Sequence, residues 1–236
     1  MKYRLVGSEM CIRDSNGIVQ ILWDRGWRLP LQTLLSTAAQ HWAGLFPAFQ
    51  FDAASLANDL GQLLRQRMVS QFEEDGFPPD LVQAVSGEGV SSARLLQDPI
   101  DARERLLLLQ DLRADGRLQA VQAVVQRASK LAEKGDLDSS QLVPDRVIEA
   151  SLFGSPSESD LLKQLETLSP LAEACDYEGL ASELQGAARA LEAFFDGENS
   201  VMVMAEDEAV RRNRLNLLGV LRNQASVLAC FDNIQS

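Results

Sequence analysis

The sequence has little of several features that common protein functions require. Its three cysteines, Cys11, Cys175 and Cys230, show none of the paired spacing of zinc or redox motifs. Such sparse cysteine indicates a reducing compartment, and we expect the cytoplasm. No apolar run approaches the roughly 20 residues that span a bilayer, and the N-terminus lacks the apolar core of a secretory signal. We therefore expect a protein that is neither exported nor attached to a membrane.

Histidine is almost missing, and this excludes several kinds of catalytic centre. His41 is the only one, whereas a metallohydrolase of the HD type needs several His and Asp ligands around its metal. A Ser-His-Asp or Cys-His set could be built only around His41, and no P-loop or Rossmann glycine pattern occurs. We expect no catalytic residue, no metal and no cofactor in this chain.

Basic residues are outnumbered, with 22 Lys and Arg against 34 Asp and Glu and a net charge of −12 over 236 residues. Affinity for a polyanion grows with the number of phosphates that a protein neutralises, so this charge opposes non-specific nucleic-acid binding. Any contact with RNA must be local. Apolar residues make up 46% and charged residues 24%, which is the composition of a globular chain that folds.

Strand signals are nearly absent, since the alternating stretch VMVM at 201–204 is too short to seed a sheet. Apolar residues instead recur at three- and four-residue spacing, which predicts amphipathic helices. The sequence predicts an all-α fold, a helical bundle. The expected helices cover residues 30–42, 52–75, 79–85, 98–114, 117–134, 158–174, 177–195 and 206–231.

The same pattern divides the chain into four parts. Residues 1–15, MKYRLVGSEMCIRDS, have no helical or alternating period and resemble translated sequencing-adapter sequence. We exclude them as non-native and expect the natural protein to continue upstream of Asn16. Residues 16–134 form a first helical region. Residues 135–157, richer in Gly, Pro, Ser and Asp, are expected to be a linker, and residues 158–236 form a second helical domain.

The most distinctive segment is FFDGENSVMVMAEDEAVRRNRL, residues 194–215. Two aromatics and an acid end a helix, an apolar turn and an acidic cluster follow, and the next helix carries an RxNRL arrangement. This segment resembles the C-terminal anticodon-binding helices of the bacterial glycyl-tRNA synthetase β-subunit family, whose last domain is of the DALR class. Looser similarity extends to NGIVQILWDRGWRLPL and to ARERLLLLQDLRADGRLQAVQAVVQRASKL, which resemble the end of that family's HD-like domain and its linking helices.

The resemblance implies that residues 16–134 are the tail of the HD-like domain with linker helices, and that residues 158–236 are a DALR-like anticodon-binding bundle. It further implies recognition of tRNA-Gly and scaffolding within glycine–tRNA ligase. That enzyme's ATP-dependent glycylation is carried out with a separate α subunit, which uses the ATP, in an α2β2 tetramer. Three departures from the family are the missing N-terminal body, an extra Glu198-Asn199 and the lack of the DALR tetrapeptide itself. The alternative, favoured by the net acidity, is a purely structural module for subunit assembly that touches no RNA.

The helix expected over 206–231 carries the candidate RNA-binding side chains. Spacing of about 100° per residue places Val210, Leu217, Leu221 and Leu228 on one core-facing stripe. Guanidinium and amide groups on the other faces can bond to unpaired bases or stack on them, although they could equally form a plain solvated surface. These candidates are Arg211, Arg212, Asn216, Arg222 and Asn223.

The family motif itself, Phe194, Phe195, Asp196, Asp207 and Arg214, has structural interpretations. Arg214 lies at the edge of the apolar stripe, where we expect it to pair with Asp207, one heptad earlier. The acidic cluster at 206–208 favours the positive end of the helix dipole. We favour a core position over a base-stacking pocket for Phe194, Phe195, Met202 and Met204.

The apolar residues near the N-terminus have two expected environments, one packed and one exposed. Trp23, Trp27 and Trp42, the only tryptophans, are expected to pack the helices of the first region. Exposed apolar surface is expected around Ile18, Ile21 and Leu22, because the family's earlier helices are not part of this sequence.

Overall fold

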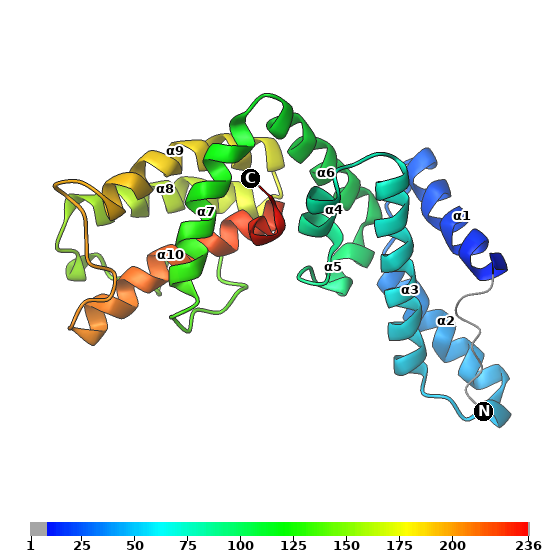
Figure 1. Ribbon diagram of the computed structural model, residues 1–236. Helices are drawn as coiled ribbons and strands as arrows, with labels where there is room; N and C mark the ends of the chain where they lie inside the picture. Colours follow the sequence, from blue (N-terminus) through cyan, green and yellow to red (C-terminus); the bar gives the residue numbers. More distant parts are fainter. Residues whose placement is uncertain (1–8, 236) are drawn as a thin grey trace. The chain divides into compact units, whose positions relative to one another are not determined.

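The computed structural model describes residues 9–235 and consists of α-helices joined by loops (Figure 1). Ten α-helices and three short 3-10 helices form all of the regular structure in this range, which contains no strand. The predicted all-α fold is confirmed. No helix in the described range is both long enough and apolar enough to cross a membrane.

The chain divides into two compact units between Leu107 and Leu108, inside helix α6 (Pro99–Ala114). Residues 135–157, where we expected a linker between domains, instead lie within the second unit. Their Gly, Pro, Ser and Asp content matches a long irregular segment that packs against helix α10 (Glu208–Leu228). Composition alone cannot separate such a segment from a linker, because both avoid regular secondary structure.

The first unit is organised around helix α3 (Ala53–Glu74). It packs against α1 (Glu9–Arg25), α2 (Leu31–Leu45), α4 (Pro79–Ser86) and α5 (Ser92–Gln97). Trp23 stacks on the buried Phe72 ring with centroids 4.6 Å apart, and its indole N–H donates to the Pro99 carbonyl at 3.1 Å. These contacts join α1 to α3 and to the start of α6.

The exposed apolar residues of this unit match part of the expectation. Ile18 and Ile21 are exposed as expected, whereas Leu22 is buried. Trp27 and Trp42 are also more than half exposed, so only Trp23 packs the helices as expected. Trp42 does contact Phe46 at 4.5 Å between ring centroids, but both rings lie at the exposed end of α2.

Helix α1 begins at Glu9, so residues 9–15 are helical although their sequence shows no helical period. An existing helix extends over adjacent residues without a new nucleation cost, and apolar periodicity is not required for that. Residues 1–8 of the excluded segment lie outside the described residues.

The second unit contains α7 (Arg117–Ala132), α8 (Pro156–Glu173), α9 (Tyr177–Phe195) and α10, with 3-10 turns η2 (Ala150–Leu152) and η3 (Phe231–Asn233). Helices α8 and α9 form an antiparallel hairpin, and α10 packs against α7, α8 and α9 (Figure 1). The hairpin turns at Cys175, whose φ is 54°, and Asp176 then caps α9 by accepting the Gly179 N–H at 3.1 Å.

Helix α10 is buried on nearly every side. From Asn213 to Ala225, only Arg214 and Arg222 are even partly accessible to solvent. Leu217, Leu221 and Leu228 are buried as expected, but so are the residues on the opposite side of the helix. The expectation of an exposed polar face is therefore wrong for the middle of α10, because residues 136–149 cover it.

Residues 136–149 approach α10 closely at Gly219. A Cβ atom at this glycine would lie 2.8 Å from Cδ2 of Leu137, which is nearer than such carbon atoms come. The absence of a side chain at position 219 lets the irregular segment lie directly on the helix backbone.

Candidate nucleic-acid interface

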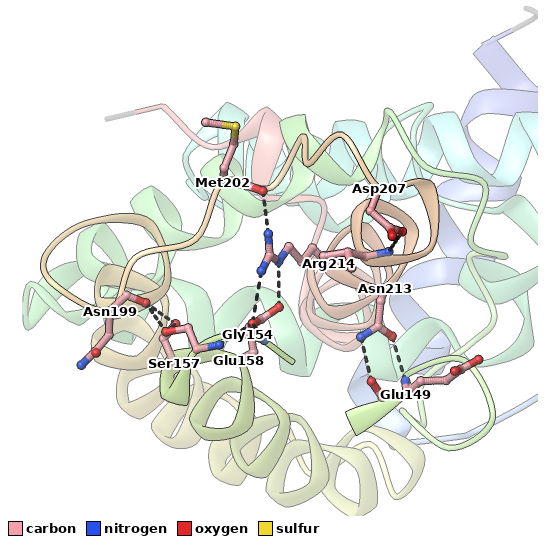
Figure 2. Close-up of polar contacts among 11 residues, drawn as sticks. Glu149, Gly154, Ser157, Glu158, Asn199, Met202, Asp207, Asn213 and Arg214 are labelled. Atoms are coloured by element: carbon pink, nitrogen blue, oxygen red, sulfur yellow. Dashed lines mark hydrogen bonds and ion pairs between the residues drawn. The ribbon is translucent and has the colours of Figure 1, made fainter. Parts of the chain in front are cut away.

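Amide side chains of α10 hold the backbone of the irregular segment 136–149. Asn213 forms a pair of hydrogen bonds with Glu149: its Nδ2 donates to the Glu149 carbonyl at 3.0 Å, and its Oδ1 accepts the Glu149 N–H at 2.8 Å (Figure 2). Asn216 Nδ2 donates to the Val147 carbonyl at 2.6 Å. Both asparagines thus supply partners that an irregular backbone cannot find within itself.

The same arrangement continues about two helical turns further along α10. Asn223 Nδ2 donates to the carbonyls of Asp138 at 2.7 Å and Gln141 at 3.0 Å. Asn216 is only 8% exposed and Asn223 only 1%. These two RNA-binding candidates are therefore buried, and their donors are used by the protein's own backbone. This burial could not be predicted from the sequence, because a covered polar face and a solvated one have the same periodicity.

Arg214 forms an ion pair with Glu158 of α8. Arg214 Nε lies 2.7 Å from Glu158 Oε1, and Nη1 donates to the Met202 carbonyl at 3.0 Å (Figure 2). Glu158 is fully buried, and its Oε2 also accepts the N–H groups of Gly154 at 2.7 Å and Ser155 at 2.9 Å. Burial raises the pKa of this carboxyl, but the hydrogen bonds from Arg214 and the two N–H groups outweigh it and leave the pKa lowered.

The expected pairing of Arg214 with Asp207 is therefore not present. Seven residues of helix separate the two positions by about 10.5 Å along the axis, beyond the reach of a direct ion pair. Asp207 instead caps the N-terminus of α10, where its carboxylate accepts the N–H groups of Ala209 at 2.8 Å and Val210 at 3.1 Å.

The aromatic end of α9 is only partly a core element. Phe194 is fully buried, and Phe195 packs against it edge-on at 5.4 Å. The Arg127 guanidinium lies 4.1 Å from the centre of the Phe195 ring and 2.6 Å from the Asp196 carboxylate, and this hydrogen bond lowers the pKa of Asp196.

The two methionines in the following loop do not belong to the core. Met202 is 74% exposed, and Met204 is also exposed, so the expected core position is wrong for both. In Figure 2 the Met202 carbonyl faces Arg214 while its side chain points away from it. The Arg214 hydrogen bond thus fixes the backbone of this loop with Met202 turned towards solvent.

The three arginine candidates differ in how far they are occupied. Arg211 is partly buried and donates to the Ala205 carbonyl at 3.1 Å, and Arg222 donates to Asn223 Oδ1 at 3.0 Å. Arg212 makes only a loose ion pair with Asp136 at 3.4 Å, in which the two side chains are 68% and 72% exposed. A pair this exposed contributes little, which leaves Arg212 the most available of the three.

A groove of about 800 Å³ lies between residues 136–152 and residues 208–216 of α10. Arg146 lines it from the irregular segment and Arg212 from the helix, together with carboxylates that include Asp136, Glu149 and Glu208. Arg146 is not among the RNA-binding residues expected from the sequence. It lies outside every expected helix and outside the resembling motif, so no periodicity or motif could have marked it.

The residues that build this groove lie in a region that is similar to known proteins. Residues 121–229 match the DALR anticodon binding domain. The chain is 41% identical over 228 residues to the glycine–tRNA ligase β subunit of Picosynechococcus sp., and 40% identical over 227 residues to that of Acaryochloris marina. The chain is a relative of the glycine–tRNA ligase β subunits. The β subunit of Trichodesmium erythraeum is 37% identical over 229 residues.

These glycine–tRNA ligase β subunits are much longer than the present chain. Each of the three comparisons covers 94% of this chain, which spans about a third, 31% or 32%, of the length of the relatives. The resemblance inferred from residues 194–215 is thus confirmed. The DALR match begins at residue 121, so it includes most of α7 and the irregular segment, upstream of the expected start at 158. Every residue that lines the groove lies inside the match.

Proposed function

We propose that the second unit binds unpaired nucleotides of the tRNA-Gly anticodon region, as a non-catalytic part of a glycine–tRNA ligase β subunit. One observation carries this proposal: the DALR anticodon binding match spans the helices and the segment that build the groove. The arginines of the groove supply donors and planar groups that unpaired bases accept. The burial of Asn216 and Asn223 moves the proposed contacts from the middle of α10 to its first turns.

The proposal also covers the partner subunit, the assembly and the cellular compartment. Glycine, ATP and the glycylation chemistry belong to a separate α subunit, and an α2β2 tetramer in the cytoplasm is the expected assembly. The names of the relatives, which are β subunits of glycine–tRNA ligases, support a partner subunit. The two described cysteines, Cys175 and Cys230, are free thiols, in keeping with a reducing compartment.

The alternative function is a structural module that assembles subunits and touches no RNA. The net charge of −12 favours it, as does the surplus of carboxylates over guanidinium groups around the groove. The two functions differ in one measurable respect, which is selective binding of the anticodon loop.

The test is binding of the whole chain to an anticodon stem-loop of tRNA-Gly and to the same stem with a scrambled loop, across a salt series. Recognition through two cations predicts a preference for the native loop and a log–log salt slope no steeper than about −1.4. Equal or undetectable binding by a chain shown to be folded would favour the structural module. Arg212→Glu should weaken the preference, whereas Arg189→Glu, on the exposed surface of α9, should retain it.

A further inference from the structure

We propose that Arg146 is a second RNA-contacting residue, that the groove takes one unpaired nucleotide between Arg146 and Arg212, and that Asn213 and Asn216 position Arg146. The proposal rests on the proposed function and extends it to residues outside the family motif. Four observations support it: the backbone of Arg146, its free guanidinium, the two walls of the groove and the charge of its lining.

The backbone at Arg146 adopts a conformation that its side chain disfavours. Its φ is 67°, in the left-handed region where Cβ crowds the following carbonyl. The turn is closed by the Val147 N–H, which donates to the Pro144 carbonyl at 3.3 Å. Asn216 and Asn213 then fix the backbone at Val147 and Glu149, immediately after the turn. Such a conformation persists because the surrounding bonds impose it.

The Arg146 side chain itself is not used by the fold. It is exposed, and its guanidinium has no hydrogen-bond or ion-pair partner in the part of the chain that the structure describes. The protein thus holds an arginine in a strained turn by four hydrogen bonds and gains no contact from its side chain. Glycine adopts this conformation without strain, so the turn by itself does not require an arginine.

The two arginines enter the groove from different elements. Arg146 comes from the irregular segment, Arg212 comes from the second turn of α10, and the Asn213 and Asn216 bonds tie these two elements together. The same side chains therefore set both the width of the groove and the position of Arg146. A groove of about 800 Å³ is within the size range of small-molecule pockets and accommodates a nucleotide.

The charge of the lining determines which part of a nucleotide lies inside. Four carboxylates, on Asp136, Asp138, Glu149 and Glu208, outnumber the two guanidinium groups. A phosphate in the interior would meet like charge, whereas a neutral base can donate its N–H groups to carboxylates and stack on a guanidinium. We therefore place the base inside the groove and its phosphates at the rim, near the arginines.

The experiment compares Arg146→Gly with Arg189→Gln in binding of the whole chain to the tRNA-Gly anticodon stem-loop. Glycine relieves the strain at position 146, so the fold should be retained and the melting temperature should not fall. RNA affinity should fall roughly tenfold, and the salt slope should become shallower by about 0.7 to 1. Arg189→Gln removes the same charge from the same unit, away from the groove, and should bind as the wild type does.

Positioning by Asn216 is tested by a double-mutant cycle. If Asn216→Ala weakens RNA binding by displacing Arg146, it should cost little further affinity when Arg146→Gly is already present. Additive losses would overturn the positioning role, and an Arg146→Gly variant that binds as tightly as the Arg189→Gln control would overturn the proposal as a whole. If the wild-type chain itself shows no loop preference, the proposed function fails first.

Discussion

Two irregular segments pack against α10, and they are held by different chemistry. Residues 136–149 are held by neutral amides, chiefly Asn213, Asn216 and Asn223, which donate to backbone carbonyls. Residues 197–206 are held by guanidinium groups, since Arg214 donates to the Met202 carbonyl and Arg211 to the Ala205 carbonyl. Arg214 in turn depends on the buried carboxylate of Glu158. The first segment is therefore held mainly by neutral amides. The second is held mainly by guanidinium groups, one of them paired with a buried carboxylate, together with the Ser155 and Ser157 hydroxyls, which donate to the Asn199 carbonyl.

The largest expected effect comes from breaking that ion pair. Arg214→Ala leaves the Glu158 carboxylate buried without its cation, which should cost about 3–5 kcal/mol of the free energy of unfolding. Denaturant titration measures this loss, and amide exchange should accelerate in residues 197–206. Arg211→Ala, which removes only one bond to a carbonyl, is the control and should cost about 0.5–1.5 kcal/mol. Equal losses in the two variants would remove the distinction between the segments.

A smaller effect is expected when one amide of the first segment is removed. Asn213→Ala leaves the N–H and C=O groups of Glu149 without their partner, which should cost about 1–3 kcal/mol. Hydrogen exchange should accelerate in residues 136–149 and stay unchanged in residues 197–206. Faster exchange in both segments would show that the two segments are not held independently by α10. That result would contradict the distinction between residues 136–149 and residues 197–206.

Lowering the pH should distinguish the stability of the two segments without any mutation. The folded-state pKa of Glu158 lies below its ordinary value of 4.5, so the unfolded state binds more protons in the acid range. The stabilisation is fully present above that value and is lost as the pH falls through the lowered pKa. Residues 197–206 should therefore open before residues 136–149, whose amides do not titrate. Amide exchange along a pH series, corrected for intrinsic rates, checks the order, and simultaneous opening would speak against it.

The smallest effect is expected at the groove. Arg212→Gln removes an exposed pair with Asp136 and should leave the melting temperature unchanged within error, because exposed ion pairs contribute little. A clear destabilisation would mean that Arg212 supports the fold, which would weaken its proposed role as an available RNA contact. Differential scanning calorimetry at low and moderate salt measures the difference.

Much of the fold could be predicted from local signals. The turn at Cys175 and Asp176 separates α8 from α9 where the sequence predicted it, because a left-handed residue followed by an aspartate cap is a local feature. The break at Asp115-Gly116 is confirmed for the same reason, since Gly116 has a φ of 80° just before α7 begins.

The site was less predictable because its contacts are distant in sequence. Arg214 meets Glu158 across 56 residues, and Asn223 meets Asp138 across 85. A helical wheel reports which residues share a face, but not whether that face meets solvent or another part of the chain. It therefore identified the buried leucines of α10 and gave the wrong environment for Asn216 and Asn223.

The close approach at Gly219 has a consequence for sequence variation. The Leu137 side chain occupies the space that a side chain at position 219 would need, since a Cβ at 219 would fall 2.8 Å from the leucine methyl. Neither position can then vary freely, and in relatives a larger residue at 219 is expected only together with a smaller one at 137. A library that randomises both codons and is selected for folded protein should recover pairs of nearly constant summed volume.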